Sequence, residues 1–271
     1  MLRWLVYQLQ VYLRRKDRVD KFRGHPKTAL VRELVKKGRW SELEALYASL
    51  RQDEKNVVTS GLADVMQAGA FDDWASARGS ALAHSLKGHL ELDLAWRVRS
   101  GAAASLVRKD AWKEYFAHLR TAFGDLRAAN ELDPSDPEPP CAMIRVLMGW
   151  GDRVAEMHEQ FDRIEGFHLP AANHLLDGLT EKWGGSHQQM FAFARTICGR
   201  NPCYGSVLAL AHVERWFAAG DGDDNEDPKS YFQKPHVRDE IIEAYERDAL
   251  LAGHELSYFA LFARSVYGLA F

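Results

Sequence analysis

Apolar residues recur every three or four positions along nearly the whole chain. Leu30, Val31, Leu34 and Val35 share one helical face, for example, and Gly38 follows as a helix terminator. No segment shows sustained alternation of apolar and polar residues, and no Asn-Gly or Asp-Gly turn joins two β-branched runs. The pattern therefore predicts an all-α protein of antiparallel helix pairs joined by short Gly- and Pro-containing turns. The predicted helices lie within residues 25–38, 40–50, 71–107, 110–134, 137–151, 152–166, 169–183, 186–199, 202–220, 234–253 and 254–271.

The spacing of tryptophans suggests a repeat. Six of them are separated by 34, 38, 38, 33 and 33 residues, at positions 40, 74, 112, 150, 183 and 216. A period near 34 residues is typical of a tetratricopeptide helix pair. The phase varies, however, because Trp112 falls inside a predicted helix while Trp150 and Trp183 fall in or beside turns. The spacing supports helix pairs but not a strict repeat.

One stretch matches the repeat more closely. "TAFGDLRAANELDPSDPEPP" resembles the second helix of a tetratricopeptide repeat, with Ala122, Leu126 and Ala129 at the packing positions and Pro134 closing the helix. The first-helix half departs from the pattern, because Lys109 and Asp110 stand where the family has a large apolar and a small residue. The resemblance covers about one repeat clearly and implies that the helix pairs stack as a degenerate tetratricopeptide-like α-solenoid.

The first residues predict an amphipathic helix with a basic end. Its apolar face comprises Leu2, Leu5, Leu9, Tyr12 and Leu13, and its basic end comprises Arg14, Arg15, Lys16 and Arg18. The stretch has no small-residue cleavage site and is too short in apolar residues to span a bilayer. We expect it to pack on the body of the protein, with a membrane surface as the alternative.

Charge is divided unequally along the chain. Residues 1–39 carry twelve Lys and Arg against three Asp and Glu, a balance of +9, so the remaining residues sum to −12 within the total of −3. This division predicts a basic N-terminal segment, 1–39, and a helical-repeat body, 40–271. The segment could pack on the acidic body or bind an anionic partner such as nucleic acid, with Arg14, Arg15, Lys16 and Arg18 as the candidate contacts.

"EKWGGSHQQMFAFAR", residues 181–195, could be a nucleophile turn, a phosphate loop or a helix start. It lacks the Gly-x-Ser-x-Gly order of a hydrolase elbow and the Lys of a phosphate loop. Ser186 and Gln189 instead have the spacing of a capping box, after Gly184 and Gly185 have turned the backbone. Ser41 and Glu44 have the same spacing and predict a second capping box.

The same stretch resembles a family of uncharacterised bacterial proteins with a tetratricopeptide-like helical fold. Their signature is Trp-Gly-Gly-Ser followed by a helix with Met and Phe-Ala. The matching residues are Trp183, Gly184, Gly185, Ser186, Met190, Phe193 and Ala194, and the resemblance extends over residues 110–220. It implies the fold and a bacterial source, but no activity.

Residues that could support chemistry are scattered. The Asp221–Asp227 stretch alternates oxygen ligands like a calcium loop, but Glu226 replaces the required Gly and Phe232 the required Glu, so a solvated acidic loop is expected. No zinc, nucleophile or cofactor motif is present, and we expect no cofactor. Three cysteines without CxxC spacing, Cys141, Cys198 and Cys203, are typical of reduced thiols in a cytoplasmic protein.

These observations favour a non-enzymatic helical-repeat protein that binds a protein or peptide through its concave face. Two alternatives stay open. One is an enzyme whose site is assembled from dispersed residues, with His168, His174, His187, Glu156 and Glu159 as the candidates. The other is binding of an anionic surface by residues 1–39.

Overall fold

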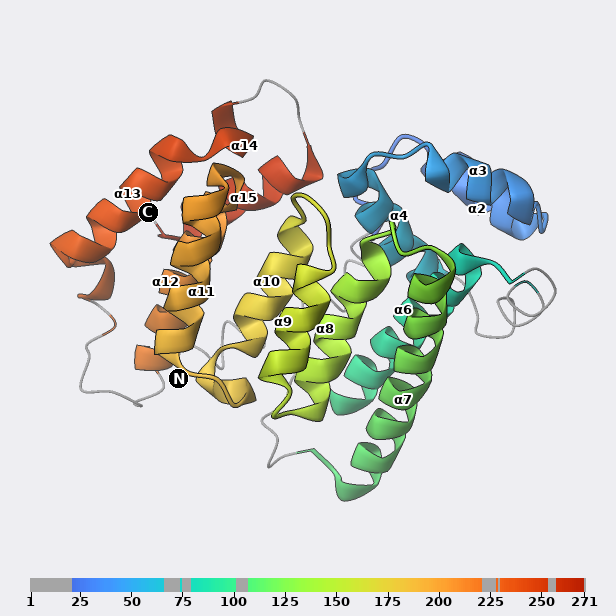
Figure 1. The fold of residues 1–271 in the computed structure, drawn as a ribbon, viewed down its shortest axis with the longest axis horizontal. Helices are drawn as coiled ribbons and strands as arrows, with labels where there is room; N and C mark the ends of the chain where they lie inside the picture. Colours follow the sequence, from blue (N-terminus) through green and yellow to red (C-terminus); the bar gives the residue numbers. More distant parts are fainter. Residues whose placement is uncertain are drawn as a thin grey trace. The chain divides into compact units, whose positions relative to one another are not determined.

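The computed structural model describes residues 21–65, 74, 79–100, 107–220, 228, 230–252 and 257–270. Every regular element within these ranges is a helix, which confirms the all-α prediction (Figure 1). The chain divides into two compact units, an N-terminal unit of Met1–Gln67 and a C-terminal unit of Ala68–Phe271. Among the described helices, none is both long enough and apolar enough to cross a membrane.

The N-terminal unit contains α2 (Thr28–Lys36), α3 (Trp40–Ala48) and α4 (Gln52–Val65). The Tyr47 hydroxyl lies 3.2 Å from Thr59 Oγ1 and joins α3 to α4. His25 Nε2 lies 3.5 Å from the Glu54 carboxylate and joins the start of the unit to α4. The unit boundary after Gln67 differs from the one predicted after residue 39, because His25 and α2, in the described part of that segment, pack with α4 and α3.

The predicted capping box at Ser41 and Glu44 is wrong. Helix α3 already begins at Trp40, with Arg39 at the N-cap position, so Ser41 lies in the first turn of the helix. Arg39 instead forms an ion pair with Glu42 three residues later. The helix begins two residues before the start at Glu42 that a Ser41 cap requires.

The C-terminal unit contains the other described helices (Figure 1). They are α6 (Ala81–Arg99), α7 (Lys109–Leu132), α8 (Glu138–Trp150), α9 (Val154–Asp162), α10 (Leu169–Gly178), η2 (Glu181–Trp183), α11 (His187–Arg200), η3 (Pro202–Tyr204), α12 (Gly205–Gly220), η4 (Tyr231–Gln233), α13 (Pro235–Arg247), α14 (Ala249–Ala252) and α15 (Tyr258–Ala270). Alternate helices pack against one another in succession, α6 on α8, α8 on α10, α10 on α12 and α12 on α15. We call these five helices the alternate-helix row. The intervening helices α7, α9 and α11 each pack against the two row helices beside them.

The closest helix approach joins α6 to α7. Ala122, Leu126 and Ala129 are fully buried on α7, at the positions singled out by the repeat pattern. Gly88 on α6 lies directly against Leu126, so that a side chain at Gly88 would overlap it. Helix α7, however, is one continuous helix from Lys109, and its partner is α6 rather than a short helix at 109–113. This is why the first-helix half of the repeat pattern fails at Lys109 and Asp110.

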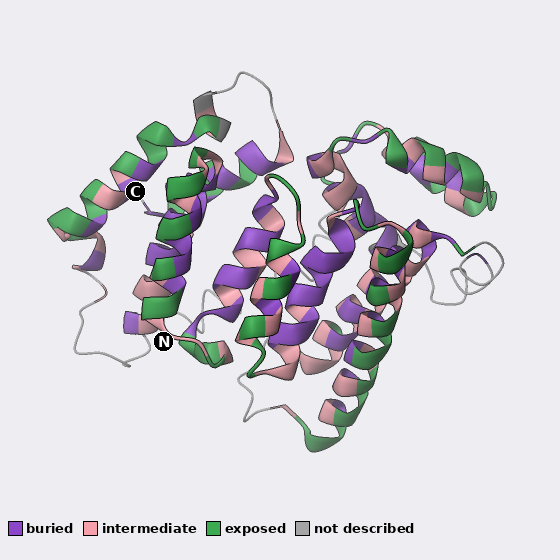
Figure 2. Cartoon of the chain, in the orientation of Figure 1, coloured by how far each residue is buried: buried purple, intermediate pink, exposed green. Residues whose placement is uncertain are grey.

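The core of the C-terminal unit runs between the row and the intervening helices (Figure 2). One part joins α6, α7 and α8 through residues such as Leu92, Leu119 and Val146. A larger part joins α8 to α12 through residues such as Ile144, Leu175 and Met190. Apolar burial at about 25 cal/mol per Å² is the main stabilising contribution to such a helical unit.

Candidate functional site

The turn before α11 has the geometry of a helix cap. Ser186 occupies the N-cap position with extended backbone, and its Oγ accepts a hydrogen bond of 3.2 Å from the Gln189 backbone N–H. The Ser186 hydroxyl in turn donates to the Gln189 side-chain oxygen at 3.2 Å. Both partners of the S-x-x-Q spacing therefore interact, through the Ser186 hydroxyl rather than through its backbone N–H.

The two glycines of this turn have different roles. Gly184 has a φ of +92°, in the left-handed region that favours glycine. Gly185 lies against the backbone of Leu179 at the end of α10, so that any side chain there would overlap the Leu179 carbonyl. The backbone geometry of this turn therefore requires glycine at both positions of "WGGS". The turn follows Trp183, which lies after α10.

Some residues for which the sequence predicts a role lie outside the described residues. These are the basic residues Arg14, Arg15, Lys16 and Arg18 and the acidic loop 221–227. The three cysteines are free thiols. No group of three or more potential metal ligands occurs within the ranges that the structure describes.

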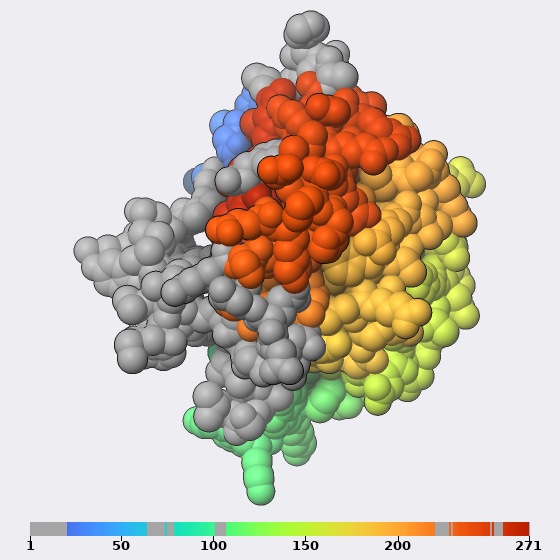
Figure 3. All heavy atoms as spheres, turned by 90° about the vertical axis from the view of Figure 1, so that its left-hand side faces the viewer, coloured from blue at the N-terminus to red at the C-terminus, as the bar shows by residue number. Residues whose placement is uncertain are grey.

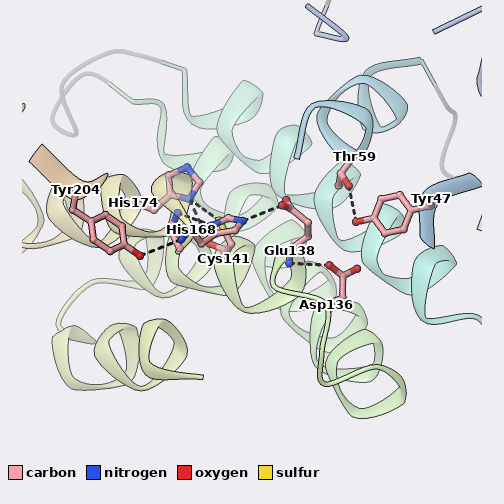
Figure 4. Close-up of polar contacts among 9 residues, drawn as sticks. Tyr47, Thr59, Asp136, Glu138, Cys141, His168, His174 and Tyr204 are labelled. Atoms are coloured by element: carbon pink, nitrogen blue, oxygen red, sulfur yellow. Dashed lines mark hydrogen bonds and ion pairs between the residues drawn. The ribbon is translucent and has the colours of Figure 1, made fainter. Parts of the chain in front are cut away.

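Two of the candidate histidines come together next to α8 (Figure 4). His168 is the N-cap of α10, and its Nδ1 accepts a hydrogen bond of 3.1 Å from the Ala171 backbone N–H. Because Nδ1 accepts, the ring proton is on Nε2, which donates to Glu138 Oε1 at 3.0 Å. Both side chains are almost completely buried. The Tyr204 hydroxyl accepts from the His168 backbone N–H at 3.1 Å. Every hydrogen-bonding atom of His168 named here has a partner inside the protein.

His174 lies beside Cys141, with 3.5 Å between its Nδ1 and the sulfur. A nucleophilic Cys-His pair needs a thiolate and an imidazolium. Burial raises the pKa of the Cys141 thiol well above its usual value, and the nearby Glu138 carboxylate raises it further. Burial and the Arg145 guanidinium lower the pKa of His174 well below its usual value. Both groups are therefore neutral at physiological pH, which is opposite to what nucleophilic catalysis requires.

The other three candidates, His187, Glu156 and Glu159, do not lie with His168 and His174. His187 is the first residue of α11, 3.7 Å from Glu181 and 3.4 Å from the Arg215 guanidinium. Glu156 pairs with Arg153 at 2.7 Å at the start of α9, and Glu159 is exposed on the same helix. The five residues proposed for an enzyme site thus form one pair and three separate positions.

A second histidine network joins three helices and was not predicted. His212 on α12 is buried, with Nδ1 2.9 Å from the Tyr231 hydroxyl and Nε2 3.0 Å from Glu240 of α13. Arg195 of α11 donates to both Glu240 oxygens, at 2.7 and 3.0 Å. Figure 3 shows the face of the molecule on which α11 and α13 lie. Sequence spacing holds no signal for it, because each residue comes from a different element.

A group of aromatic rings and guanidiniums lies at the carboxyl end of α6. The Trp96 ring meets Trp183 edge to face at 5.5 Å and Tyr115 at 5.8 Å between ring centroids. The Arg99 guanidinium lies 5.7 Å from the Trp96 ring centroid and 5.1 Å from that of Trp183. The Arg145 guanidinium lies 5.4 Å from the Trp96 centroid. We call these five residues the aromatic–arginine cluster.

Three hydrogen-bond donors of the cluster are buried without an acceptor among the described residues. They are Trp96 Nε1, Trp183 Nε1 and the Tyr115 hydroxyl. Burial raises the pKa of Tyr115 to about 12 against the opposing effect of both arginines, so the hydroxyl keeps its proton. Arg145 forms no ion pair or hydrogen bond with any residue that the structure describes. Buried donors without acceptors are rare in folded proteins, and here three belong to rings that meet at Trp96.

Comparison with known proteins gave no relatives: no family model, no curated protein and no solved structure matches the chain.

Proposed function

We propose that the chain is a non-enzymatic helical-repeat protein that binds a protein or peptide partner through the alternate-helix row. The helix pairs α6–α7, α8–α9, α10–α11 and α12–α13 are consistent with a degenerate tetratricopeptide-like α-solenoid. In such arrays the first helix of each pair lines the concave binding face. Four of the five row helices, α6, α8, α10 and α12, are the first members of these pairs. The observation that carries the proposal is the aromatic–arginine cluster, because it includes donors without acceptors and three of its residues, Trp96, Arg99 and Arg145, lie on the row helices α6 and α8.

The chemistry of the histidines supports binding over catalysis. His168 is committed to a helix cap and to Glu138, and the Cys141–His174 pair is neutral. Catalytic groups need an accessible ionisable atom near a substrate. His168 and His174, the two candidates of the enzyme alternative that lie close together, therefore have structural roles.

Binding of an anionic surface by residues 1–39 remains the other alternative. In the described part of this segment, Lys37 pairs with Glu33 at 2.7 Å, and Arg39 pairs with Glu42. These pairs neutralise two of its cations locally. The alternate-helix row has the stronger case, because its cluster contains buried donors as well as charge.

A random-peptide display screen tests the proposal. We expect enriched peptides to protect amides of α6, α8 and α10 from hydrogen exchange, and to leave α9, α11 and α13 unchanged. Failure to enrich any peptide, or protection confined to the intervening helices, would contradict the proposal. Protection confined to residues 1–39 would favour the anionic-surface alternative.

A further inference from the structure

We infer that the aromatic–arginine cluster binds a carboxylate of an acidic peptide. This inference rests on the proposed peptide-binding function and assigns the chemistry of its site. The juxtaposition that carries it is Trp96, Tyr115 and Trp183, with buried donors that lack acceptors, beside the guanidinium of Arg145.

The cluster has many hydrogen-bond donors and almost no acceptors. An indole offers only an N–H donor, and a guanidinium offers N–H donors and no acceptor. The Tyr115 hydroxyl is the only group of the five that could accept, and its own proton also lacks an acceptor. A carboxylate supplies two oxygens with about four acceptor sites and a negative charge, so it complements this set of donors.

Other buried groups of the same kinds are satisfied, which makes the cluster exceptional within this protein. Four of the five buried tyrosines in the described residues have hydroxyl partners, namely Tyr47, Tyr204, Tyr231 and Tyr267. Tyr115 is the fifth. The Trp216 indole, likewise, donates to the Pro228 carbonyl at 3.0 Å. Ser85 Oγ and Ser206 Oγ of the same unit are also buried without a partner in the described part of the chain, so the cluster is distinguished by carrying three such atoms on rings joined through Trp96.

The charge of the site favours an anion. The guanidiniums of Arg99 and Arg145 both favour the ionised form of Tyr115, and Arg145 disfavours the protonated form of His174. The Arg145 guanidinium on α8 therefore acts on both Tyr115 of α7 and His174 of α10. An open pocket of about 350 Å³ adjoins the cluster at Arg99, between the end of α6 and the start of α7. Arg99 is the one cluster residue in its lining, which also includes Arg108 and Glu114. An acidic side chain in this pocket would lie next to the Arg99 guanidinium.

Peptide binding to the full chain, measured by fluorescence anisotropy, tests the inference. Three fluorescently labelled peptides serve as probes. Acetyl-tetraglutamate amide has side-chain carboxylates only, and acetyl-tetraglutamine acid has a terminal carboxylate only. Acetyl-tetraglutamine amide has no carboxylate. We expect binding of one or both carboxylate peptides and none of the neutral amide, and the bound probe identifies the source of the carboxylate. Arg145→Met should weaken binding about tenfold or more, as loss of a charge-assisted hydrogen bond does.

Matched variants separate this site from the rest of the molecule. Arg247→Met on α13, where the arginine is exposed and pairs with Glu243 at 3.0 Å, should leave binding unchanged. Trp183→Phe keeps an aromatic ring, removes one donor and should weaken binding. Thermal unfolding of each variant establishes that it is folded.

Three outcomes would overturn the inference. The first is no binding of either carboxylate peptide, and the second is equal binding of the neutral peptide. The third is binding that survives Arg145→Met but is lost when Arg14, Arg15, Lys16 and Arg18 are replaced by Gln. If the display screen nevertheless finds peptides on the alternate-helix row, the proposed function stands and only the carboxylate assignment fails.

Discussion

Two polar regions of the C-terminal unit differ in whether their donors find acceptors. Around His168, the imidazole, the Ala171 N–H and the Glu138 carboxylate are mutually paired, and the Tyr204 hydroxyl completes the group. In the aromatic–arginine cluster, three donors and one guanidinium have no acceptor among the described residues. Paired buried groups stabilise a fold, whereas unpaired ones cost stability unless a ligand supplies the partner.

Whether buried donors have acceptors distinguishes the structural histidines from the candidate binding site, and residue type alone does not. Histidine beside glutamate and cysteine resembles an active site, yet in this protein it caps a helix. Tryptophan and arginine resemble core filling and surface charge, yet they form the region with unmet donors. The predictions below test each half of this comparison.

The largest effect is expected at His168. His168→Leu removes the cap of α10 and the buried partner of Glu138, so the free energy of unfolding should fall by about 3–5 kcal/mol, as for other broken buried pairs. Urea denaturation measures it. His168→Asn retains an oxygen that can accept the Ala171 N–H and should lose less. A loss below about 1 kcal/mol for His168→Leu would contradict the structural role of this group.

Gly149→Ala tests the packing around Tyr115. A methyl group at Gly149 would overlap the Tyr115 hydroxyl and would lie 2.9 Å from Leu119 Cδ1. Overpacking of this kind costs about 1–3 kcal/mol. In a Tyr115→Phe background the hydroxyl is absent, so the same substitution should cost less. Equal losses in both backgrounds, measured by urea denaturation, would show that Tyr115 does not occupy this space.

Acid should destabilise the histidine region. The pKa values of His174 and His212 are lowered by burial, so these residues take up protons more readily in the unfolded chain, where histidine has a pKa of about 6.5. Their contribution is present above that pH and is lost as the pH falls below it, by up to about 1.4 kcal/mol per pH unit for each group.

Chemical denaturation at a series of pH values checks this direction. His174→Gln and His212→Gln should each flatten the dependence below pH ~6.5. Tetraglutamate binding, by contrast, should vary little between pH ~6 and ~8, since Tyr115 in the cluster titrates near 12. A pH-independent unfolding free energy in the wild-type protein would contradict the account of these histidines.

Ser186→Ala removes a cap whose acceptor is in use, so the unfolding free energy should fall by about 0.5–2 kcal/mol. Ser41→Ala is the matched control, because Ser41 lies within the first turn of α3 and not at its N-cap. Thermal unfolding of both variants should show the larger shift for Ser186→Ala. Equal shifts would mean that the Ser186 cap contributes nothing specific.

The smallest effect is expected at Tyr115. Tyr115→Phe removes a buried hydroxyl that has no partner, so stability should stay the same or rise by up to about 1 kcal/mol. Tyr204→Phe, in contrast, leaves the His168 backbone N–H without an acceptor and should cost about 1–3 kcal/mol. Destabilisation of equal size in the two variants would show that Tyr115 has a partner inside the protein.

Local patterns predicted the parts of the molecule that depend on neighbouring residues. Apolar periodicity predicted most of the helices but missed α4 (Gln52–Val65), and the S-x-x-Q spacing at Ser186 coincides with an actual helix start. The same spacing at Ser41 gave a wrong prediction, because capping depends on where the helix begins, and α3 begins at Trp40, two residues before the start that a Ser41 cap requires. The choice between these two starts is made by packing, which the spacing of two residues does not contain.

The candidate site depends on contacts between distant segments and was therefore not predicted. Trp96 falls outside the series of tryptophans with a period near 34 residues, yet it is the ring to which the rest of the cluster attaches. Likewise, His168 pairs with Glu138, thirty residues earlier, and not with the nearer Glu156 or Glu159. A tryptophan out of register with the others was the one signal in the sequence that pointed to this site.

The indole N–H signals of the full chain, observed by two-dimensional nitrogen–proton NMR and assigned by single Trp→Phe variants, test the central claim most directly. On addition of the carboxylate peptide that binds, the signals of Trp96 and Trp183 should move downfield as their donors gain an acceptor, while that of Trp216, already bonded to Pro228, should stay in place. Unmoved signals of Trp96 and Trp183 at saturating peptide, or equal movement of all three, would contradict the account.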